Sequence, residues 1–326
     1  MTTGQLPDLS VLITAGNHRE RVANALASVL TQKIADRLEA IVLECGDAHN
    51  PPLQGSDRSN VKTVHFAKGV SAGQVRAAAV RMARAPVVAF LEEHAAVAPG
   101  WAEAILAAFA KDEWAAVGPE IVNGNQKCGV SDVLSLGFYP LYEMNPMRQE
   151  ETWLPFHNSA YRRDTIMKYD QELEILFALE ILLQWRLRRD GHHLLLDPAM
   201  KVIHYYETDI LAVWRANRNA SQVFAANWSK LYSWSTGRRI IRILSTPVMP
   251  LVRSLKLLRI LFKRRPDQLG RFVKGLPVML LSHSADATGE FLGLLFGAGA
   301  ADIRYLDHSV NAPRRLPSDF PHFSLD

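Results

Sequence analysis

Residues Ala85–His94 read APVVAFLEEH, and this stretch decides the fold. The unbroken apolar run that ends at Leu91 is typical of a strand buried on both faces, as in a parallel sheet covered by helices. The run stops at two carboxylates and an imidazole, Glu92, Glu93 and His94. Ligands of such sheets bind beyond the carboxyl ends of the strands. The stretch therefore predicts an α/β fold with ligand-binding residues at the edge of its sheet.

Strands and helices alternate around this stretch. An apolar helical face runs through Val22–Leu30, and Asn17 with Glu20 three residues later predicts a capping box before it. Thr14, Asn17 and Glu44 stand where two other strands end, so we expect them at the same edge of the sheet. Further strands are expected at Ser10–Thr14, Ala40–Leu43 and Val61–Phe66, and further helices at Ser71–Ala83 and Trp101–Ala110; Ala115–Val117 leads to a turn at Gly118-Pro119. This order predicts a Rossmann-like, mostly parallel sheet covered on both faces.

The cluster after the apolar run suggests a divalent cation. Carboxylate oxygens of Glu92 and Glu93 suit Mg²⁺ or Mn²⁺, and the imidazole of His94 shifts the preference toward Mn²⁺. The other interpretation is a solvated turn. His204 closes a predicted strand, Met200–His204, and a single histidine there is more often a hydrogen-bonded structural residue than a metal ligand.

A leucine-rich segment, Leu173–Arg189, predicts one continuous helix with Glu180 at or beside its apolar stripe. An inward carboxylate would be desolvated, and burial raises a carboxyl pKa toward the range of a general base. Periodicity alone favours the other orientation, with Glu180 pointing outward and paired with Arg162, Arg163 or Gln184. After this helix we expect two strands joined by a turn at Asp197-Pro198, whereas 118–151 shows no clear periodicity and is expected to form loops with short elements.

Length and composition set outer limits. The chain has 326 residues, of which 48% are hydrophobic and 21% charged, so it is globular, with one large domain and an appendage or two domains. Two cysteines, Cys45 and Cys128, argue against a disulfide scaffold or a structural zinc site. The first residues lack the pattern of a secretory signal, and the longest apolar stretch, Gly275–Ala301, is interrupted by charged residues. We therefore expect a cytoplasmic protein without a membrane span.

Two other enzyme classes are disfavoured. Gly69–Gly73 reads GVSAG, which matches the nucleophile elbow of serine hydrolases, and Asp197 and His204 follow Ser71 in the expected order. However, no HGGG-like oxyanion segment accompanies it. A nicotinamide dehydrogenase is disfavoured because the turn after the first strand has no G-x-G-x-x-G.

From about Leu9 to Asp209 the chain resembles the family 2 glycosyltransferases, the inverting enzymes with the GT-A nucleotide-sugar-binding fold. The resemblance rests on the order and spacing of several short segments. They are Ser10–Asn17 at the opening strand, Ile41–Gly46 at the base-binding segment, Gly69–Arg76 at the turn before the helix arginine, Phe90–His94 at the metal motif, Asn158–Arg163 at the acceptor side, Leu179-Glu180 before Arg186-Leu187, and Pro198–His204 at the final strand.

The resemblance implies a role for each candidate residue. Glu180 corresponds to the general base. His94, Glu93 and His204 correspond to ligands of a divalent cation, Mn²⁺ or Mg²⁺. The nucleotide-diphosphate sugar that serves as donor is expected to contact Thr14, Asn17, Glu44, Arg76, Glu92 and Glu93. The acceptor implied is a hydroxyl on a glycan, a lipid-linked compound or another molecule, as in the synthesis of cell-envelope polysaccharide.

The chain also departs from the family pattern. The usual aspartates of the metal motif are replaced by Glu92, Glu93 and His94, and Leu179 replaces a glutamate. These departures leave an alternative from another class, a catalytically silent nucleotide-sugar-binding scaffold subunit at a membrane.

The positive charge of the chain is concentrated in residues 237–275, which contain eleven Lys and Arg and one acidic residue. Leu251–Phe262 predicts a basic amphipathic helix, with Arg253, Lys256 and Arg259 opposite a leucine-rich apolar face. An anionic membrane surface, at the inner face of the membrane, is the partner that this segment favours. The alternative is packing on the catalytic domain or on a second subunit of a homo-oligomer. Nucleic acid is not expected, because no recognised binding module is present. We accordingly predict a catalytic domain at 1–210 and a basic helical region at 211–326.

Overall fold

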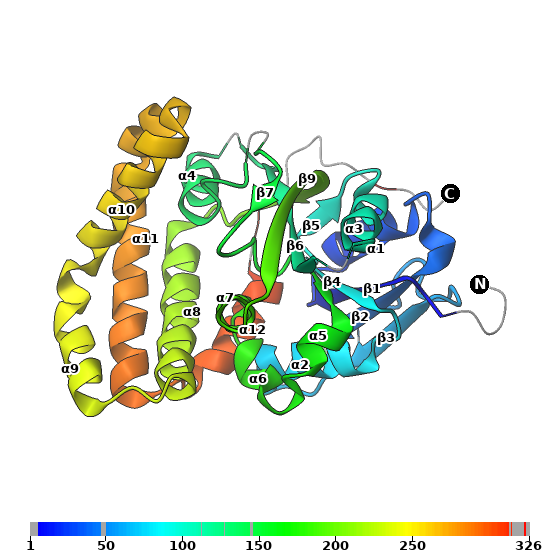
Figure 1. The fold of residues 1–326 in the computed structure, drawn as a ribbon, viewed down its shortest axis with the longest axis horizontal. Coiled ribbons are helices and arrows are strands. Elements are labelled where there is room, and N and C mark those ends of the chain that lie inside the picture. Colours follow the sequence, from blue (N-terminus) through cyan, green and yellow to red (C-terminus); the bar gives the residue numbers. More distant parts are fainter. Residues whose placement is uncertain are drawn as a thin grey trace. The chain divides into compact units, whose positions relative to one another are not determined.

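The computed structural model of the chain describes residues 6–46, 50–111, 113–126, 128–143, 146–312, 314 and 323. They form two compact units (Figure 1). Unit 1 comprises Met1–Val122, Met144–His204 and Ser318–Asp326, and unit 2 comprises Asn123–Glu143 and Tyr205–Pro317.

Unit 1 is built on one large sheet with the strand order β3-β2-β1-β4-β8-β6-β9-β5, and β7 pairs with β9. Its strands are β1 (Leu9–Ala15), β2 (Leu38–Glu44), β3 (Val61–His65), β4 (Val87–Glu92), β5 (Ala95–Val97), β6 (Trp114–Asn123), β7 (Gln149–Glu150), β8 (Ala160–Arg162) and β9 (His193–His204). The first four strands in this order are parallel, and β8 joins β4 in the antiparallel direction. The parallel register aligns Thr14 with both Leu43 and Glu92, so polar residues from distant parts of the chain meet at one edge, as predicted.

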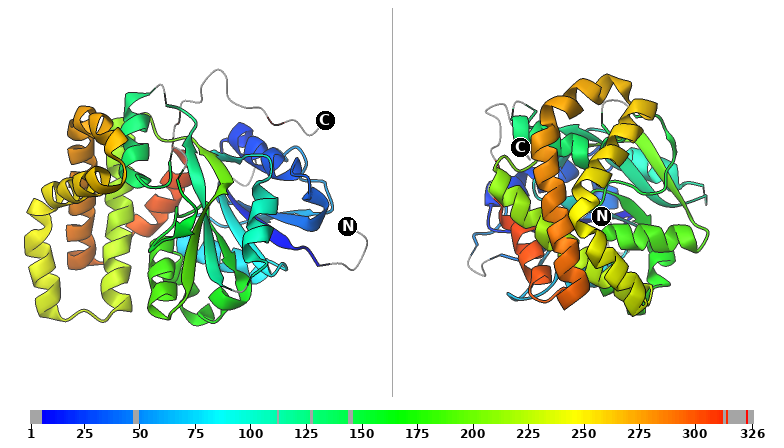
Figure 2. Two further views of the ribbon diagram at one scale, coloured as in Figure 1. Left: turned by 45° about the horizontal axis from the view of Figure 1, so that its top comes forward. Right: turned by 90° about the vertical axis from the view of Figure 1, so that its left-hand side faces the viewer.

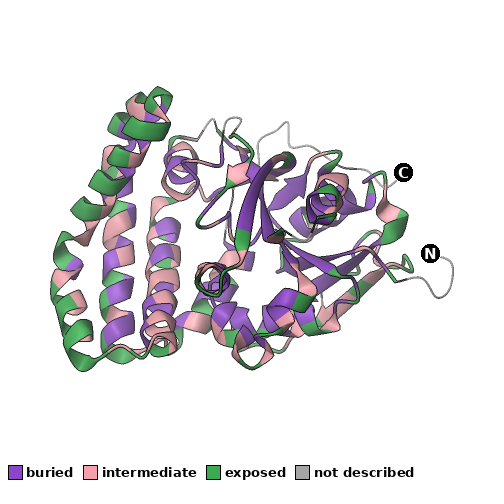
Figure 3. Cartoon of the chain, in the orientation of Figure 1, coloured by how far each residue is buried: buried purple, intermediate pink, exposed green. Residues whose placement is uncertain are grey.

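Helices cover both faces of this sheet (Figures 1 and 2). They are α1 (Arg19–Leu30), α2 (Ala72–Met82), α3 (Trp101–Phe109), α5 (Arg163–Met167), α6 (Leu173–Leu176) and α7 (Glu180–Arg189). The strands β1 and β2 are buried throughout, because apolar side chains on both of their faces pack under helices (Figure 3). The expectation of an α/β fold is therefore confirmed.

Three local predictions were wrong. The first helix begins at Arg19, and Asn17 does not cap it; its side-chain oxygen instead accepts a hydrogen bond from Asn50. Segment 173–189 is not one helix, because the chain leaves the helical conformation between α6 and α7. His193–His204 is one continuous strand, without the expected turn at Asp197-Pro198.

The break between α6 and α7 has a tertiary cause. Arg76 on α2 is buried and donates a hydrogen bond from Nη1 to the carbonyl oxygen of Phe177. In a continuous helix this carbonyl would accept a hydrogen bond from a backbone N–H of the next turn. At Gly73 an added Cβ would lie only 2.0 Å from the carbonyl oxygen of Glu174, so α2 approaches α6 more closely than a larger residue would allow. These contacts override the leucine periodicity and make Glu180 the first residue of α7.

Unit 2 is helical. It contains α4 (Gly129–Phe138), α8 (Ile210–Leu231), α9 (Thr236–Ser245), α10 (Met249–Arg264), α11 (Leu269–Phe296) and α12 (Ala301–Asn311). The long helices α8 and α11 pack closely because two glycines of α11 face the backbone of α8. A Cβ added at Gly289 would lie 2.1 Å from the carbonyl oxygen of Arg218, and one added at Gly293 would lie 2.2 Å from that of Gln222. Among the described residues, no helix is both long enough and apolar enough to cross a membrane.

Candidate active site

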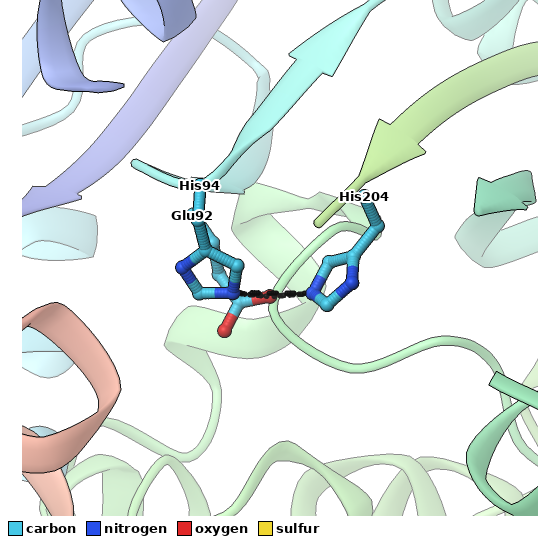
Figure 4. A group of neighbouring side chains, drawn as sticks. All are labelled: Glu92, His94 and His204. Carbon is cyan, nitrogen blue, oxygen red and sulfur yellow. Dashed lines mark hydrogen bonds and ion pairs between the residues drawn. The ribbon is translucent and has the colours of Figure 1, made fainter. Parts of the chain in front are cut away.

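Three potential metal ligands converge at the edge of the sheet in unit 1 (Figure 4). Glu92 ends β4, His94 immediately precedes β5, and His204 ends β9. Because β5 and β9 pair with Ala95 opposite His204, the two imidazoles are brought together. The Nε2 atoms of the two histidines are 3.2 Å apart, and Oε2 of Glu92 lies 3.0 Å from Nε2 of His204 and 3.4 Å from Nε2 of His94.

The donor set of this cluster fits a first-row divalent cation. Two imidazole nitrogens and one carboxylate oxygen suit Mn²⁺ and its neighbours better than Mg²⁺, which prefers oxygen ligands. Burial by itself raises the pKa of Glu92, but the imidazoles of His94 and His204 outweigh it and hold that pKa well below its usual range. Glu92 is thus an ionised carboxylate, the form in which it can ligate a cation.

Glu93, expected among the ligands, lies behind His94. Its Oε2 atom is 2.6 Å from Nδ1 of His94, and its Oε1 atom is 2.9 Å from Nη2 of Arg21 on α1. Both the carboxylate and the guanidinium are buried. An imidazole that donates its Nδ1 proton to a carboxylate presents Nε2 as an acceptor, which is the arrangement found behind many metal-binding histidines. Glu93 therefore orients His94 toward the cluster.

Glu180 is fully buried, so the expectation that it points outward toward Arg162, Arg163 or Gln184 was wrong. Its Oε1 atom lies 3.0 Å from Nδ1 of His157, and its Oε2 atom accepts a hydrogen bond of 3.1 Å from the hydroxyl of Tyr161. As the first residue of α7 it also lies at the positive end of the helix dipole. Burial, followed by the nearby negative charge of Glu180, raises the pKa of Tyr161 well above its usual range, so Tyr161 remains a proton donor to the carboxylate.

Two consecutive residues connect Glu180 to the metal-ligand cluster. His157 pairs with Glu180, and the side-chain nitrogen of Asn158 donates a hydrogen bond of 3.1 Å to Oε2 of Glu92. His157 adopts a φ of 69°, a left-handed conformation that is uncommon for a residue other than glycine and concentrates at functional sites. Sequence reasoning missed His157, because nothing in the pattern around it distinguishes it from a loop histidine.

The other predicted binding residues lie in unit 1 as well. Glu44 ends β2 and is held by Nη1 of Arg19 at 2.7 Å and by His65 at 2.9 Å. Thr14 lies beside Glu92 in the sheet register, and the side-chain oxygen of Asn17 lies against Gly46, just after β2. Arg76 is buried, and its side chain donates a hydrogen bond to the carbonyl oxygen of Phe177.

Cys45 follows Glu44 at this edge of the sheet. Burial raises the pKa of Cys45 to about 12, with a partial offset from the positive charge of Arg76, so the thiol is protonated and unsuited to nucleophilic catalysis.

The hydrolase constellation is not assembled. Ser71 is the N-cap of α2, where its hydroxyl accepts a hydrogen bond from the backbone of Gln74 in a complete capping box. Asp197 pairs with Arg148, while His204 faces Glu92. The GVSAG sequence is thus explained by helix capping.

Comparison with known proteins agrees with this geometry. Residues 10–170 match the model of the family described as glycosyl transferase family 2. Residues 10–170 therefore form a family 2 glycosyltransferase domain.

Among solved structures, the chain is similar to the crystal structure of GalNAc-T7 with UDP, GalNAc and Mn²⁺, at 16% sequence identity and a TM-score of 0.48. The match covers 62% of this chain and 43% of that one, so the chain spans less than half of the structure it resembles. No curated protein matches the sequence.

Proposed function

We propose that the protein transfers a sugar from a nucleotide-diphosphate sugar to a hydroxyl group by a single displacement that inverts the anomeric carbon. The acceptor would be a glycan, a lipid-linked compound or another hydroxyl compound, of the kind used in cell-envelope polysaccharide synthesis. In this proposal residues 1–210 form the catalytic domain, and 211–326 a helical region with a separate role.

Glu92, His94 and His204 are the proposed ligands of a divalent cation, and Glu93 orients His94. When bound, such a cation supplies Lewis-acid stabilisation of the negative charge on the departing diphosphate. The convergence of two imidazoles and an ionised carboxylate supports this assignment. Thr14, Asn17 and Glu44 are proposed to contact the nucleotide, because they end neighbouring strands at the same edge, and Arg76 supports that side through its charge beside Cys45.

Glu180 is the proposed general base. As the acceptor oxygen forms its bond to the anomeric carbon, the bond from that carbon to the diphosphate oxygen breaks, and the hydroxyl proton passes to Glu180. The nucleoside diphosphate leaves with the bonding electron pair. Tyr161 keeps its proton because its pKa is raised, so it holds the carboxylate in place without competing for the incoming proton.

The observation that carries the proposal is the link between the base and the metal ligands. His157 contacts Glu180 while Asn158 contacts Glu92, so the proton acceptor and the leaving-group site are held by adjacent residues of one segment. Proton NMR of sugar nucleotides incubated with the protein, with water or a simple alcohol as acceptor, tests it. We expect a product of the opposite anomeric configuration to the donor; retention of configuration would contradict a single displacement.

A further inference from the structure

The α9–α10 face, defined here as the outward surface of residues 236–264, combines exposed apolar and basic side chains. Helix α11 lies between α8 and the pair α9 and α10, and no other described helix of unit 2 covers the face (Figures 1 and 2). No residue of α9 is buried. The large apolar side chains exposed on this face are Ile240, Ile241, Leu244, Val248, Leu251, Val252, Leu255 and Phe262, and Leu244 and Phe262 are 74% and 72% exposed.

In helix α10, Leu251, Leu255 and Phe262 of the predicted apolar face are exposed and do not pack inward. The side that packs against α11 carries Ser254, Leu257 and Leu261. Leu251, Leu255 and Phe262 project outward, in a row spaced by whole turns of the helix. Lys256, Arg259 and Lys263 form a second exposed row next to it, at spacings of three and four residues. Apolar and cationic side chains therefore share one exposed half of the helix.

Some basic residues of this face are engaged within unit 2, and others are not. Arg242 and Arg253 turn inward and pair with Glu290 of α11, which is only 1% exposed, and the Arg253 pair measures 2.7 Å. This buried carboxylate fastens both helices to α11. Lys256, Arg259 and Lys263 make no ion pair or hydrogen bond with any described residue, and they remain available to an external anion.

We propose that the α9–α10 face binds the surface of an anionic lipid bilayer, with Leu251, Leu255 and Phe262 inserted among the lipids and the three cations at the headgroups. A surface that pairs an apolar row with adjacent cations matches the interfacial region of such a bilayer, where both are stabilised at once. A second copy of the chain fits less well, because residues 236–264 contain no acidic side chain that could pair with the cations of the other copy. A nucleic acid would neutralise the cations but leave the protruding apolar row in water.

Vesicle flotation of the full chain tests this proposal, using phosphatidylcholine vesicles with and without phosphatidylglycerol. The test variant replaces Lys256, Arg259 and Lys263 by Gln. The matched control replaces Lys33, Lys62 and Lys111 by Gln, which removes the same charge from exposed positions of unit 1. A second test variant, the apolar variant, carries both Leu251→Gln and Phe262→Gln. Its control carries both Leu211→Gln and Phe296→Gln, which replace exposed apolar residues outside the face.

We expect the unmodified protein to float with anionic vesicles and not with neutral ones. Each cation near a charged membrane contributes about fivefold to binding, so the test variant should bind about 100-fold more weakly and the control nearly unchanged. The apolar variant should lose binding at physiological salt, unlike its control.

Absence of flotation at low salt, or equal loss in test and control variants, would overturn the proposal. So would a dimer that the apolar variant dissociates while vesicle binding persists. Because none of these residues belongs to the candidate active site, sugar-nucleotide binding should be unchanged in every variant, which separates this test from that of the catalytic proposal.

Discussion

Nδ1 of His157 lies 3.0 Å from Oε1 of Glu180, deep in unit 1 and away from solvent. The next residue, Asn158, holds Glu92 through its side-chain amide. A histidine in a left-handed backbone conformation therefore stands between the proposed base and the proposed metal ligands. This arrangement gives the two halves of a transfer reaction, deprotonation of the acceptor and stabilisation of the leaving group, one shared support.

Replacement of Glu180 by Gln removes the base with little change in shape. We expect Glu180→Gln to lower kcat by about 10²–10⁴-fold, the usual contribution of a positioned general base. Circular dichroism and Mn²⁺ affinity should be unchanged. Glu174→Gln, an exposed carboxylate in the preceding helix, serves as control and should keep full activity. Normal turnover by the Glu180 variant would assign the base elsewhere.

Replacement of His94 or His204 by Ala removes one ligand of the proposed metal site. We expect either variant to lose measurable Mn²⁺ binding by calorimetry, because only three protein ligands from the described residues converge there. His192→Ala, at a half-buried position after α7, controls for the loss of an imidazole. Undiminished Mn²⁺ binding by both variants would place the cation at another site.

Glu93→Gln tests the support behind His94. The amide has only one acceptor oxygen and no charge, so it cannot both accept a hydrogen bond from Nδ1 of His94 and pair with Arg21 as the carboxylate does. Loss of such a support typically weakens metal binding by about 10–100-fold. Calorimetric titration with Mn²⁺ measures the change, and Glu20→Gln, an exposed carboxylate on the same helix as Arg21, is the control. If Glu93→Gln bound Mn²⁺ as tightly as the unmodified protein, an orienting role for Glu93 would be excluded.

His283 in α11 gives unit 2 a defined pH dependence. Burial, assisted by the positive charge of Arg253, lowers the pKa of His283 from 6.5 to about 4. The unfolded chain therefore binds a proton between these values while the folded protein does not. Stability is fully present above pH 6.5 and falls as the pH drops toward 4, by on the order of 3 kcal/mol.

Urea unfolding of the protein at several pH values between 7 and 5 measures this effect. We expect His283→Gln to flatten the decline in the free energy of unfolding over that interval. His193→Gln, on the surface of unit 1, should leave the decline in place. An identical pH profile for the His283 variant would contradict a neutral buried imidazole.

The sequence predicted the parallel half of the sheet well, because burial on both faces leaves a direct mark: unbroken apolar runs such as Val87–Leu91. It also predicted that Thr14, Glu44 and Glu92 would meet at one edge, since parallel strands end together. Local sequence patterns were sufficient to predict these strands and the edge at which they end.

The orientation of Glu180 depends on tertiary contacts that no local pattern reveals. Helical periodicity assumes a continuous helix, but the hydrogen bond from Arg76 to Phe177 and the close approach at Gly73 interrupt it. The position of His157 likewise depends on an uncommon backbone angle. In α10, two faces carry apolar residues, and only the packing against α11 decides that Leu257 is buried and Leu255 exposed.

Thermal unfolding with UDP-, GDP- and dTDP-sugars, each with and without Mn²⁺, tests the central claim most directly. A ligand present at about 100 times its Kd stabilises the folded state by about 2.7 kcal/mol, which raises the melting temperature by several degrees. The account predicts that at least one sugar nucleotide gives this rise with Mn²⁺, and that His204→Ala abolishes it. A protein indifferent to every sugar nucleotide, or a rise that His204→Ala leaves intact, would contradict a metal-assisted diphosphate site at this edge of the sheet.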